Sequence, residues 1–341
     1  MISDEIIIVT EYTDYSASFV LQWLLYFKAK AVRINSEEKN LTIQYFRLGN
    51  VNHETNLRIS SELTFDDHNK RTIWFRRGYI NFLNTKINVD TVFKKSILNT
   101  GNNRQETINH LNDEYSSLKT GVYDYICKNN NVIGNPIEYQ ANKLISLEHA
   151  KKSGLLIPDT LITTSKAELL KFYELHKKII TKGIQEAHAI RVNSNFTATY
   201  TKSITLDFIN ELPAHFIPSL FQIQIEKFIE IRVFIFEKLI YSMAIFSQND
   251  KQTEVDFRAY NYKRPNRYVP FEIPKSISKK LFAFMKRMNL NSGSIDLVLT
   301  PQSKYYFLEV NPVGQFSFVS QECNYNIERD IANYLIKINE S

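Results

Sequence analysis

The chain has 341 residues, which is enough for two or three compact lobes that each bury a core. Its content of 43% hydrophobic and 23% charged residues is ordinary for a soluble globular protein. The formal net charge of +6 suits acidic partners such as a nucleotide or an acidic peptide, with nucleic acid a weaker second choice, and the lack of a GxxxxGK[S/T] motif excludes a P-loop.

The beginning of the chain has no features of a targeting segment. Asp4 and Glu5 stand where a signal peptide would carry basic residues. The longest apolar helix candidate, Phe19 to Phe27, is too short to span a bilayer. Cys127 and Cys323 form no CxxC motif, which favours a reducing compartment. We therefore expect a cytoplasmic protein without a membrane segment.

The first elements predict a Rossmann-like lobe with a parallel sheet. Ile6 to Val9 reads as a buried strand, Ser16 can cap a helix from Ala17 to about Lys30, and Ala31 to Ile34 reads as the next strand. No GxGxxG motif is present, so no dinucleotide is assigned. The further strands expected in this lobe are Leu41 to Phe46 and Thr72 to Phe75.

The middle of the chain connects this lobe to a second one. The run Trp74-Phe75-Arg76-Arg77-Gly78 ends a strand, and a solvated charge pair with a turn glycine explains it on physical grounds alone. Gln105 to Lys128 is predicted as one or two connecting helices, and Pro136 breaks the chain after them. A second lobe then begins with a helix from Tyr139 to Ser153, closed by Gly154.

Two lysines in the second lobe have an ordinary explanation. Ile179 to Lys182 is strand-like and ends with its lysine, and Lys143 lies on the preceding helix. Lysines in such places are commonly solvated.

The stretch from Phe221 to Phe236 is apolar and strand-like. The edge of such a strand offers backbone N–H and C=O groups that can bind the rim of an adenine, and apolar neighbours can enclose the ring. For Lys227 and Glu230, which lie within the stretch, a surface ion pair is the alternative to a functional role.

Arg232 interrupts an apolar run between Ile231 and Val233. A buried guanidinium needs an anion. A phosphoryl group or a developing oxyanion would supply one, because the planar guanidinium can bind both. A salt bridge to Glu230 or Asp256 is the structural alternative.

The last strands, Ile295 to Leu299 and Tyr305 to Val310, predict a hairpin that places Asp296 opposite Glu309. Asn311 shares their face. Like charges opposed on a sheet repel unless a cation lies between them, and three oxygen-bearing side chains suit Mg²⁺. Simple solvation of the two acids is the alternative. The residues expected to point the other way, into a core, are Ile295, Leu297, Leu299, Leu308 and Val310.

The sequences GSIDLVL and FLEVNPVGQF resemble the last two strands of the ATP-grasp ligases, and the GQF ending resembles the microviridin-type or graspetide synthetases, which macrocyclise ribosomally made peptides. The WFRRG run resembles a WxRR element in the N-terminal lobe of peptide-modifying ATP-grasp proteins. The opening EYTDYSASFVLQWL…VRIN resembles the grasp-with-spasm maturases, which are found beside radical-SAM SPASM proteins. The resemblance implies an α/β (α+β) ATP-grasp fold with a pre-ATP-grasp lobe (1–135), a central lid domain (136–221) and a C-terminal domain (222–341).

The resemblance also implies roles for individual residues. Asp296, Glu309 and Asn311 would hold Mg²⁺, and Arg232 and Lys182 would act in catalysis. The residues implied to bind ATP are Lys143, Lys182, Gln222, Ile225, Lys227 and Asn311.

Two further segments are compared with the family. Asp256 and Arg258 follow Ser247-Gln248 in an SQ…DxR element, which in the family would position the core peptide. Period-two spacing places this pair on one strand face, so a mutual or substrate-bridged ion pair is possible. The segment from Gln185 to Thr199 lies where a glycine-rich phosphate lid is expected but contains no glycine.

The resemblance implies an ADP-forming ligase. It would activate Asp or Glu side chains of a precursor peptide, made of leader and core, as acyl phosphates, and close esters with Thr or Ser or amides with Lys. ATP and Mg²⁺ are the expected cofactors, and a SPASM protein and a second copy of the chain are expected partners. The alternatives are an amino-acid ligase of the same fold and a non-catalytic peptide-binding partner of a SPASM protein.

Overall fold

The structure is a computed structural model, and it divides into two compact units, Met1–Tyr139 with Glu328–Ser341, and Gln140–Ile327. The domain boundaries expected from the sequence stay predictions. In the described part of the chain, no helix combines the length and the apolar character needed to cross a bilayer. The residues described are 5–38, 41, 43–48, 56–59, 63–66, 70–80, 104–136, 141–185, 189–192, 195–198, 201–248 and 265–341.

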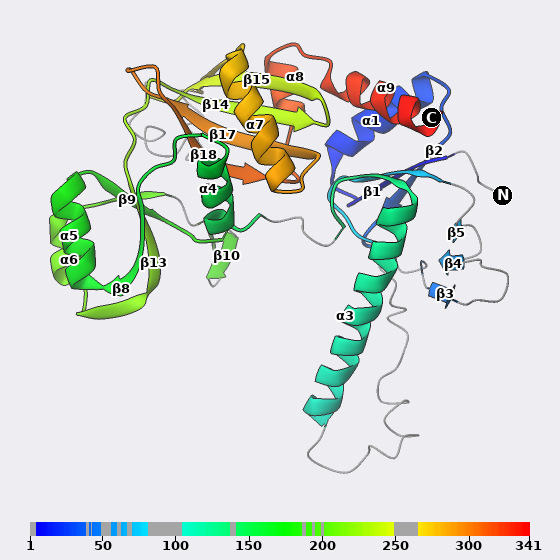
Figure 1. Ribbon diagram of the computed structural model, residues 1–341, viewed down its shortest axis with the longest axis horizontal. Coiled ribbons are helices and arrows are strands. Elements are labelled where there is room, and N and C mark those ends of the chain that lie inside the picture. The colour runs from blue at the N-terminus through cyan, green and yellow to red at the C-terminus, as the bar shows by residue number, and fades with distance from the viewer. Residues whose placement is uncertain are drawn as a thin grey trace. The chain divides into compact units, whose positions relative to one another are not determined.

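The first unit is built on a parallel sheet in the order β2-β1-β6-β7, of which Figure 1 labels β1 and β2. The strands β1 and β6 in the middle are buried throughout, as their nearly continuous apolar sequences require. The predicted β-α-β opening on a parallel sheet is confirmed. The strands are β1 (Ile6–Thr10), β2 (Ala31–Asn35), β6 (Thr72–Phe75) and β7 (Asn131–Ile133).

Helix α1 (Tyr15–Tyr26) differs from its prediction at both ends. Asp14, and not Ser16, is the N-cap, because its carboxylate accepts the backbone N–H of Ala17 at 3.3 Å. The helix ends four residues before Lys30, the predicted end.

The described part of the first unit also contains a separate antiparallel sheet and two further helices. The segment predicted as one or two connecting helices is a single helix, α3 (Arg104–Asn129). Helix α9 (Ile327–Asn339) buries one apolar stripe, and nearly all of it belongs to this unit. The strands of the small sheet are β3 (Ile43–Arg47), β4 (Asn56–Ile59) and β5 (Leu63–Asp66).

The second unit contains an antiparallel sheet in the order β12-β9-β13-β8, with α5 and α6 beside it (Figure 1). Ile179 and Phe221 point from this sheet into a core that includes Leu169 of α5 and Ile209 of α6. Side chains alternate along a strand, so Gln222 points to the opposite face. The elements are α4 (Lys143–Lys152), β8 (Thr160–Ser165), α5 (Lys166–His176), β9 (Ile179–Lys182), the β10–β11 hairpin (Ala189–Val192, Asn195–Ala198), β12 (Lys202–Ile204), α6 (Leu206–Glu211) and β13 (His215–Ile223).

The second sheet of this unit is antiparallel in the order β16-β15-β14-β17-β18. Helices α4 and α7 pack on one of its faces, against Ile231, Val233 and Leu297 among others. Burial of each such side chain contributes about 1.5–3 kcal/mol. Arg232 and Asp296 alternate with these residues and therefore point to the other face. The elements are β14 (Ile229–Phe236), β15 (Leu239–Phe246), β16 (Arg267–Pro270), α7 (Lys275–Arg287), β17 (Ser292–Leu299), β18 (Tyr305–Asn311) and α8 (Ser317–Glu322).

The hairpin of β17 and β18 places Asp296 directly opposite Glu309, as predicted. After Asp296 the register shifts by one residue, so that Leu297 pairs with Phe307. The prediction that Leu308 points into the core was therefore wrong. Phe307 is fully buried in its place, and Leu308 lines a pocket.

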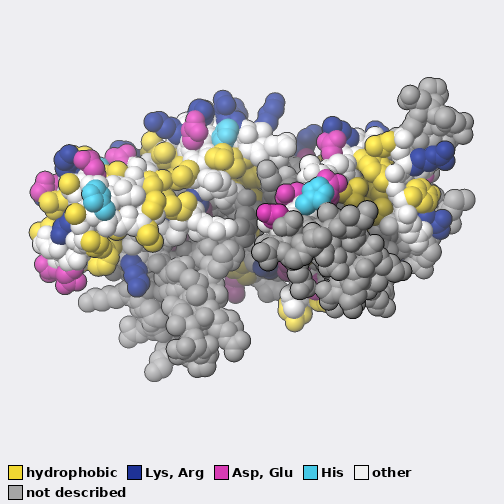
Figure 2. Space-filling model, turned by 90° about the horizontal axis from the view of Figure 1, so that it is seen from below, with side chains coloured by type: hydrophobic (Ala, Val, Ile, Leu, Met, Phe, Trp, Pro, Cys, Tyr) yellow, Lys and Arg dark blue, Asp and Glu magenta, His cyan; other side chains and the backbone are white. Residues whose placement is uncertain are grey.

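On the face that Figure 2 shows, the described basic and acidic side chains are interspersed and not gathered by sign. That face therefore gives no support to the weaker expectation of nucleic-acid binding, which would favour a basic patch.

Candidate active site

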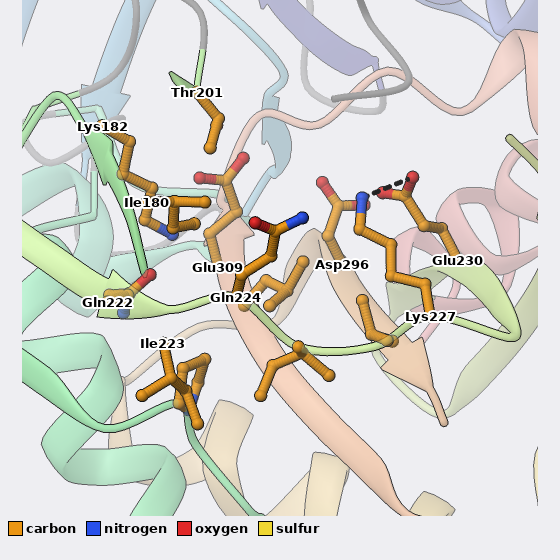
Figure 3. Close-up of a pocket in the computed structure, with 14 residues that line it drawn as sticks. Ile180, Lys182, Thr201, Gln222, Ile223, Gln224, Lys227, Glu230, Asp296 and Glu309 are labelled. Atoms are coloured by element: carbon orange, nitrogen blue, oxygen red, sulfur yellow. Dashed lines mark hydrogen bonds and ion pairs between the residues drawn. The ribbon is translucent and has the colours of Figure 1, made fainter. Parts of the chain in front are cut away.

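The four-stranded and five-stranded sheets of the second unit line a pocket that is open to solvent. Its empty space, including open solvent at the mouth, is about 700 Å³. Figure 3 shows Asp296, Lys227 and Glu230 toward one side, Lys182, Gln222 and Ile223 toward the other, and Glu309 between them. The lining residues are Pro158, Ile180, Lys182, Thr201, Gln222, Ile223, Gln224, Ile225, Lys227, Glu230, Asp296, Val298, Leu308 and Glu309.

Asp296 and Glu309 form the acidic part of this pocket, from neighbouring strands. Arg232 on β14 lies opposite Asp296 on its other side. The Nε and Nη2 groups of Arg232 donate to Oδ1 and Oδ2 of Asp296, each at 2.7 Å. Only 15% and 17% of the two side chains are exposed, so this bidentate ion pair is shielded from bulk water and strong.

This partner of Arg232 was missed in the sequence, where Glu230 and Asp256 were the alternatives. The pairing of Arg232 with Asp296 follows from the register of β14 on β17. No local sequence pattern encodes that register, so the sequence carried no signal for this partner.

Lys143, the first residue of α4, lies close to the second carboxylate. Its Nζ is 3.7 Å from Oε2 of Glu309. The same Nζ donates to the backbone carbonyls of Gly183 and Gln185, at 2.9 and 3.1 Å. The lysine therefore contacts both the acidic part of the pocket and the segment that follows β9 and Lys182.

Lys227 and Glu230 form the ion pair that was the alternative to a functional role, but the pair is not at the surface. Nζ and Oε1 are 3.1 Å apart, the side chains are 11% and 8% exposed, and both line the pocket (Figure 3). Ser247 Oγ also donates to Oε1 of Glu230, at 2.7 Å. Burial raises the pKa of Glu230, although Lys227 and Ser247 oppose this shift.

Gln222 lies at the other end of the pocket and is 1% exposed. Its Nε2 donates to Oγ1 of Thr160 at 2.8 Å. Within the described residues, its buried Oε1 has no hydrogen-bond partner. A buried acceptor of this kind favours a ligand that donates a hydrogen bond.

Ile225 lies just beyond the last backbone pairs of β13. Those pairs end at Ile223, and the N–H of Gln224 donates to the carbonyl of Lys178 at 2.9 Å. Ile225 is thus placed at the rim of the pocket, where a backbone group can meet a ligand.

Asn311 is two residues beyond Glu309 and does not line the pocket. Its Oδ1 accepts the N–H of Val313 at 3.1 Å, so this oxygen already stabilises the turn after β18. An amide oxygen has a second lone pair and can still serve as a ligand.

The side-chain oxygens of Asp296, Glu309 and Asn311 are the candidate ligands for a divalent cation. In the described residues there is no cluster of three or more His, Cys, Asp and Glu side chains able to hold a metal. Two opposed carboxylates with an amide oxygen nearby do fit a hard cation such as Mg²⁺, which keeps waters and shares its shell with phosphates. Such a cation would compete with Arg232 for Asp296 and with Lys143 for Glu309.

Two other parts of the predicted site lie wholly or partly outside the described residues. Asp256 and Arg258, the predicted peptide-binding pair, lie outside the described residues. So does part of the predicted lid, Gln185 to Thr199.

Two lining residues show what sequence reasoning missed. Val298 follows Asp296 by two positions, so strand alternation could have identified it. Leu308 could not be found in this way, because only the register shift turns it toward the pocket.

The second unit thus has a pocket between two antiparallel sheets, with paired carboxylates on the last hairpin, and its fold is of the ATP-grasp class. Comparison with solved structures shows this fold for the chain. No family model matches the sequence, and no curated protein does.

Several solved structures match almost the whole chain, among them the following three. A RiPP-associated ATP-grasp ligase of Chryseobacterium gregarium, in complex with ADP and a leader and core peptide, has a TM-score of 0.76 at 22% identity and covers 98% of this chain and 97% of its own. Macrocyclase MdnC of Microcystis aeruginosa, bound to precursor peptide MdnA, has a TM-score of 0.71 at 24% identity and covers 98% of this chain and 99% of its own. ATP-grasp ligase PsnB with minimal precursor, Mg and ADP has a TM-score of 0.66 at 17% identity and covers 98% of each chain.

Proposed function

We propose that the chain is an ATP-dependent, ADP-forming carboxylate ligase that acts on a ribosomally made precursor peptide. It would activate Asp or Glu side chains as acyl phosphates and close side-chain esters with Thr or Ser, or amides with Lys. The observation that carries the proposal is one pocket with paired carboxylates and cations at one end and an apolar wall with a buried open acceptor at the other.

The apolar end suits adenine. Ile180, Ile223 and Leu308 supply apolar surface for the ring. The Oε1 of Gln222 can accept a hydrogen bond from the N6 amino group, and the backbone of Ile225 can meet the ring edge. A guanine offers an acceptor at the equivalent position, so the orphaned Oε1 favours ATP over GTP.

The charged end suits the triphosphate. Lys143, Lys182 and Lys227 bring positive charge to the phosphates, and Asp296 and Glu309, with Asn311, would hold Mg²⁺. When bound, Mg²⁺ would neutralise phosphate charge and orient the transferred group.

Arg232 would stabilise the phosphoryl oxygens and the oxyanion that develops when the acyl group is attacked. A peptide carboxylate oxygen bonds to the terminal phosphorus and ADP leaves. A hydroxyl or amine of the same peptide then bonds to the acyl carbon, phosphate leaves, and the proton of the hydroxyl or amine is released.

The solved relatives support this choice of substrate. One holds a leader and core peptide with ADP, and two others hold precursor peptides. By analogy, Asp256 and Arg258 would position the core part of the precursor peptide that this chain modifies.

We also propose a cytoplasmic location, a homodimer and a SPASM-domain partner, all of which rest on the sequence resemblance.

The test is a mass measurement. The chain is incubated with ATP, Mg²⁺, free amino acids and a short Thr- and acid-rich peptide encoded beside its gene. We expect the peptide to lose one water per ring, with one ADP formed for each. A gain of an amino-acid residue mass would instead identify an amino-acid ligase, and ADP release that depends on the peptide would exclude a non-catalytic binding protein.

The matched control compares two acids of the second unit. Glu309→Gln removes a proposed metal ligand, whereas Glu272→Gln changes an exposed acid that lines a different cavity. Ring formation should be lost in the first variant and kept in the second.

A further inference from the structure

Arg232 has a second neighbour besides Asp296. Its Cζ lies 5.5 Å from the ring centroid of Phe318, within the range of a cation–π contact. Phe318 belongs to α8 and is half-buried. Its ring packs edge to face against Tyr268 of β16, with the centroids 6.4 Å apart. A carboxylate from β17 and an aromatic ring from α8 therefore hold the same guanidinium.

The two neighbours differ in what competes for them. Asp296 is a proposed metal ligand, so a divalent cation would draw its charge away from Arg232. The ring of Phe318 has no oxygen to offer a hard cation. Of these two contacts, only the one with the ring is untouched by metal binding.

We propose that Phe318 is a positioning residue for Arg232. The face of the Phe318 ring holds the guanidinium of Arg232 in place when Asp296 binds a divalent cation. The inference rests on the proposed function, since it assumes that Asp296 binds the metal. The competing explanation is that Phe318 only fills space beside Tyr268.

The chain offers a matched control pair on the same sheet. Arg267 on β16 lies opposite Phe246 on β15, and its Cζ is 5.4 Å from the ring centroid of Phe246. Replacing Phe246 by Leu therefore removes an equivalent cation–π contact, but one that does not involve Arg232.

The first measurement follows the side chain itself. The Nε–Hε resonance of Arg232, assigned with the Arg232→Lys variant, is recorded in the full-length chain with and without Mg²⁺ and ADP. With both present, we expect a single sharp signal in the wild type, in F318Y and in F246L. In F318L the signal should broaden, because the guanidinium has lost the contact that Mg²⁺ does not disturb.

The second measurement is peptide-dependent ADP release. We expect F318L to lower kcat about tenfold with KM for ATP unchanged to within about twofold, and F318Y to recover most of the rate. F318M, a second apolar replacement, should repeat the loss if F318L proves unstable in a thermal melt.

The outcomes separate the two ideas. A sharp Arg232 signal in F318L, or an equal loss in F318Y, overturns the positioning role. If the wild type releases no ADP with any peptide, the proposed function fails, and the resonance measurement still decides whether the ring holds Arg232.

Discussion

The two ends of the pocket solve different problems. At the charged end, each acid has an ion-pair partner: Asp296 with Arg232, Glu309 with Lys143, and Glu230 with Lys227. At the apolar end, by contrast, the buried Oε1 of Gln222 has no partner in the described part of the chain. A ligand that binds at the charged end must therefore replace existing ion pairs. A ligand that binds at the apolar end can donate a hydrogen bond to the Oε1 of Gln222 without breaking a contact of that oxygen.

This difference predicts that the charged end controls the rate and the apolar end controls which nucleotide binds. The largest effect is expected for Asp296→Asn, which removes the proposed metal ligand and the bidentate partner of Arg232. We expect at least about a 10³-fold loss of kcat for peptide-dependent ADP release. A loss below about tenfold would show that the acidic pair is not part of the reaction.

The register shift in β18 gives a test by paired truncation. Phe307→Ala leaves a cavity in the core and should destabilise the protein by about 3–5 kcal/mol in urea unfolding. Leu308→Ala should affect stability much less and raise KM for ATP a few-fold, because Leu308 lines the pocket. The opposite result would place Leu308 in the core, where the sequence alone had put it.

Gln222→Leu tests the apolar end. We expect KM for ATP to rise about tenfold with little change in kcat, since one hydrogen bond to the base is lost and preference over GTP weakens. Thr160→Val removes the partner of Nε2 and leaves Oε1 in place, so it serves as the control. Equal loss of ATP and GTP binding in Gln222→Leu would exclude a role in choosing the base.

The smallest effect concerns pH. A carboxyl whose pKa is raised on folding stabilises the protein below its ordinary pKa, and this contribution is lost as the pH rises through the raised pKa. Glu230 has a raised pKa because it is buried. In metal-free thermal melts from about pH 4 to about pH 8, Glu230→Gln should therefore gain Tm relative to the wild type as the pH rises. Parallel curves would contradict the shift.

Much of the site could be predicted because the responsible patterns are local. Acids that interrupt apolar strands mark Asp296 and Glu309, and the symmetric turn between them gives their pairing. Arg232 stands out for the same reason. The N-cap of α1 was predicted wrongly although the pattern is local. Asp14 and Ser16 are both good N-cap residues, and only the backbone conformation at the start of the helix decides between them.

The sequence by itself determined which residues carry charge into an apolar sheet, and the parallel sheet that opens the chain. Only the tertiary structure decided that Arg232 holds Asp296, that Lys143 reaches Glu309, and that Leu308 faces the pocket. These contacts join strands and helices far apart in the chain, and one shift of register exchanges the two faces of a strand. No local pattern contains that information, because it is fixed by how the sheets pack.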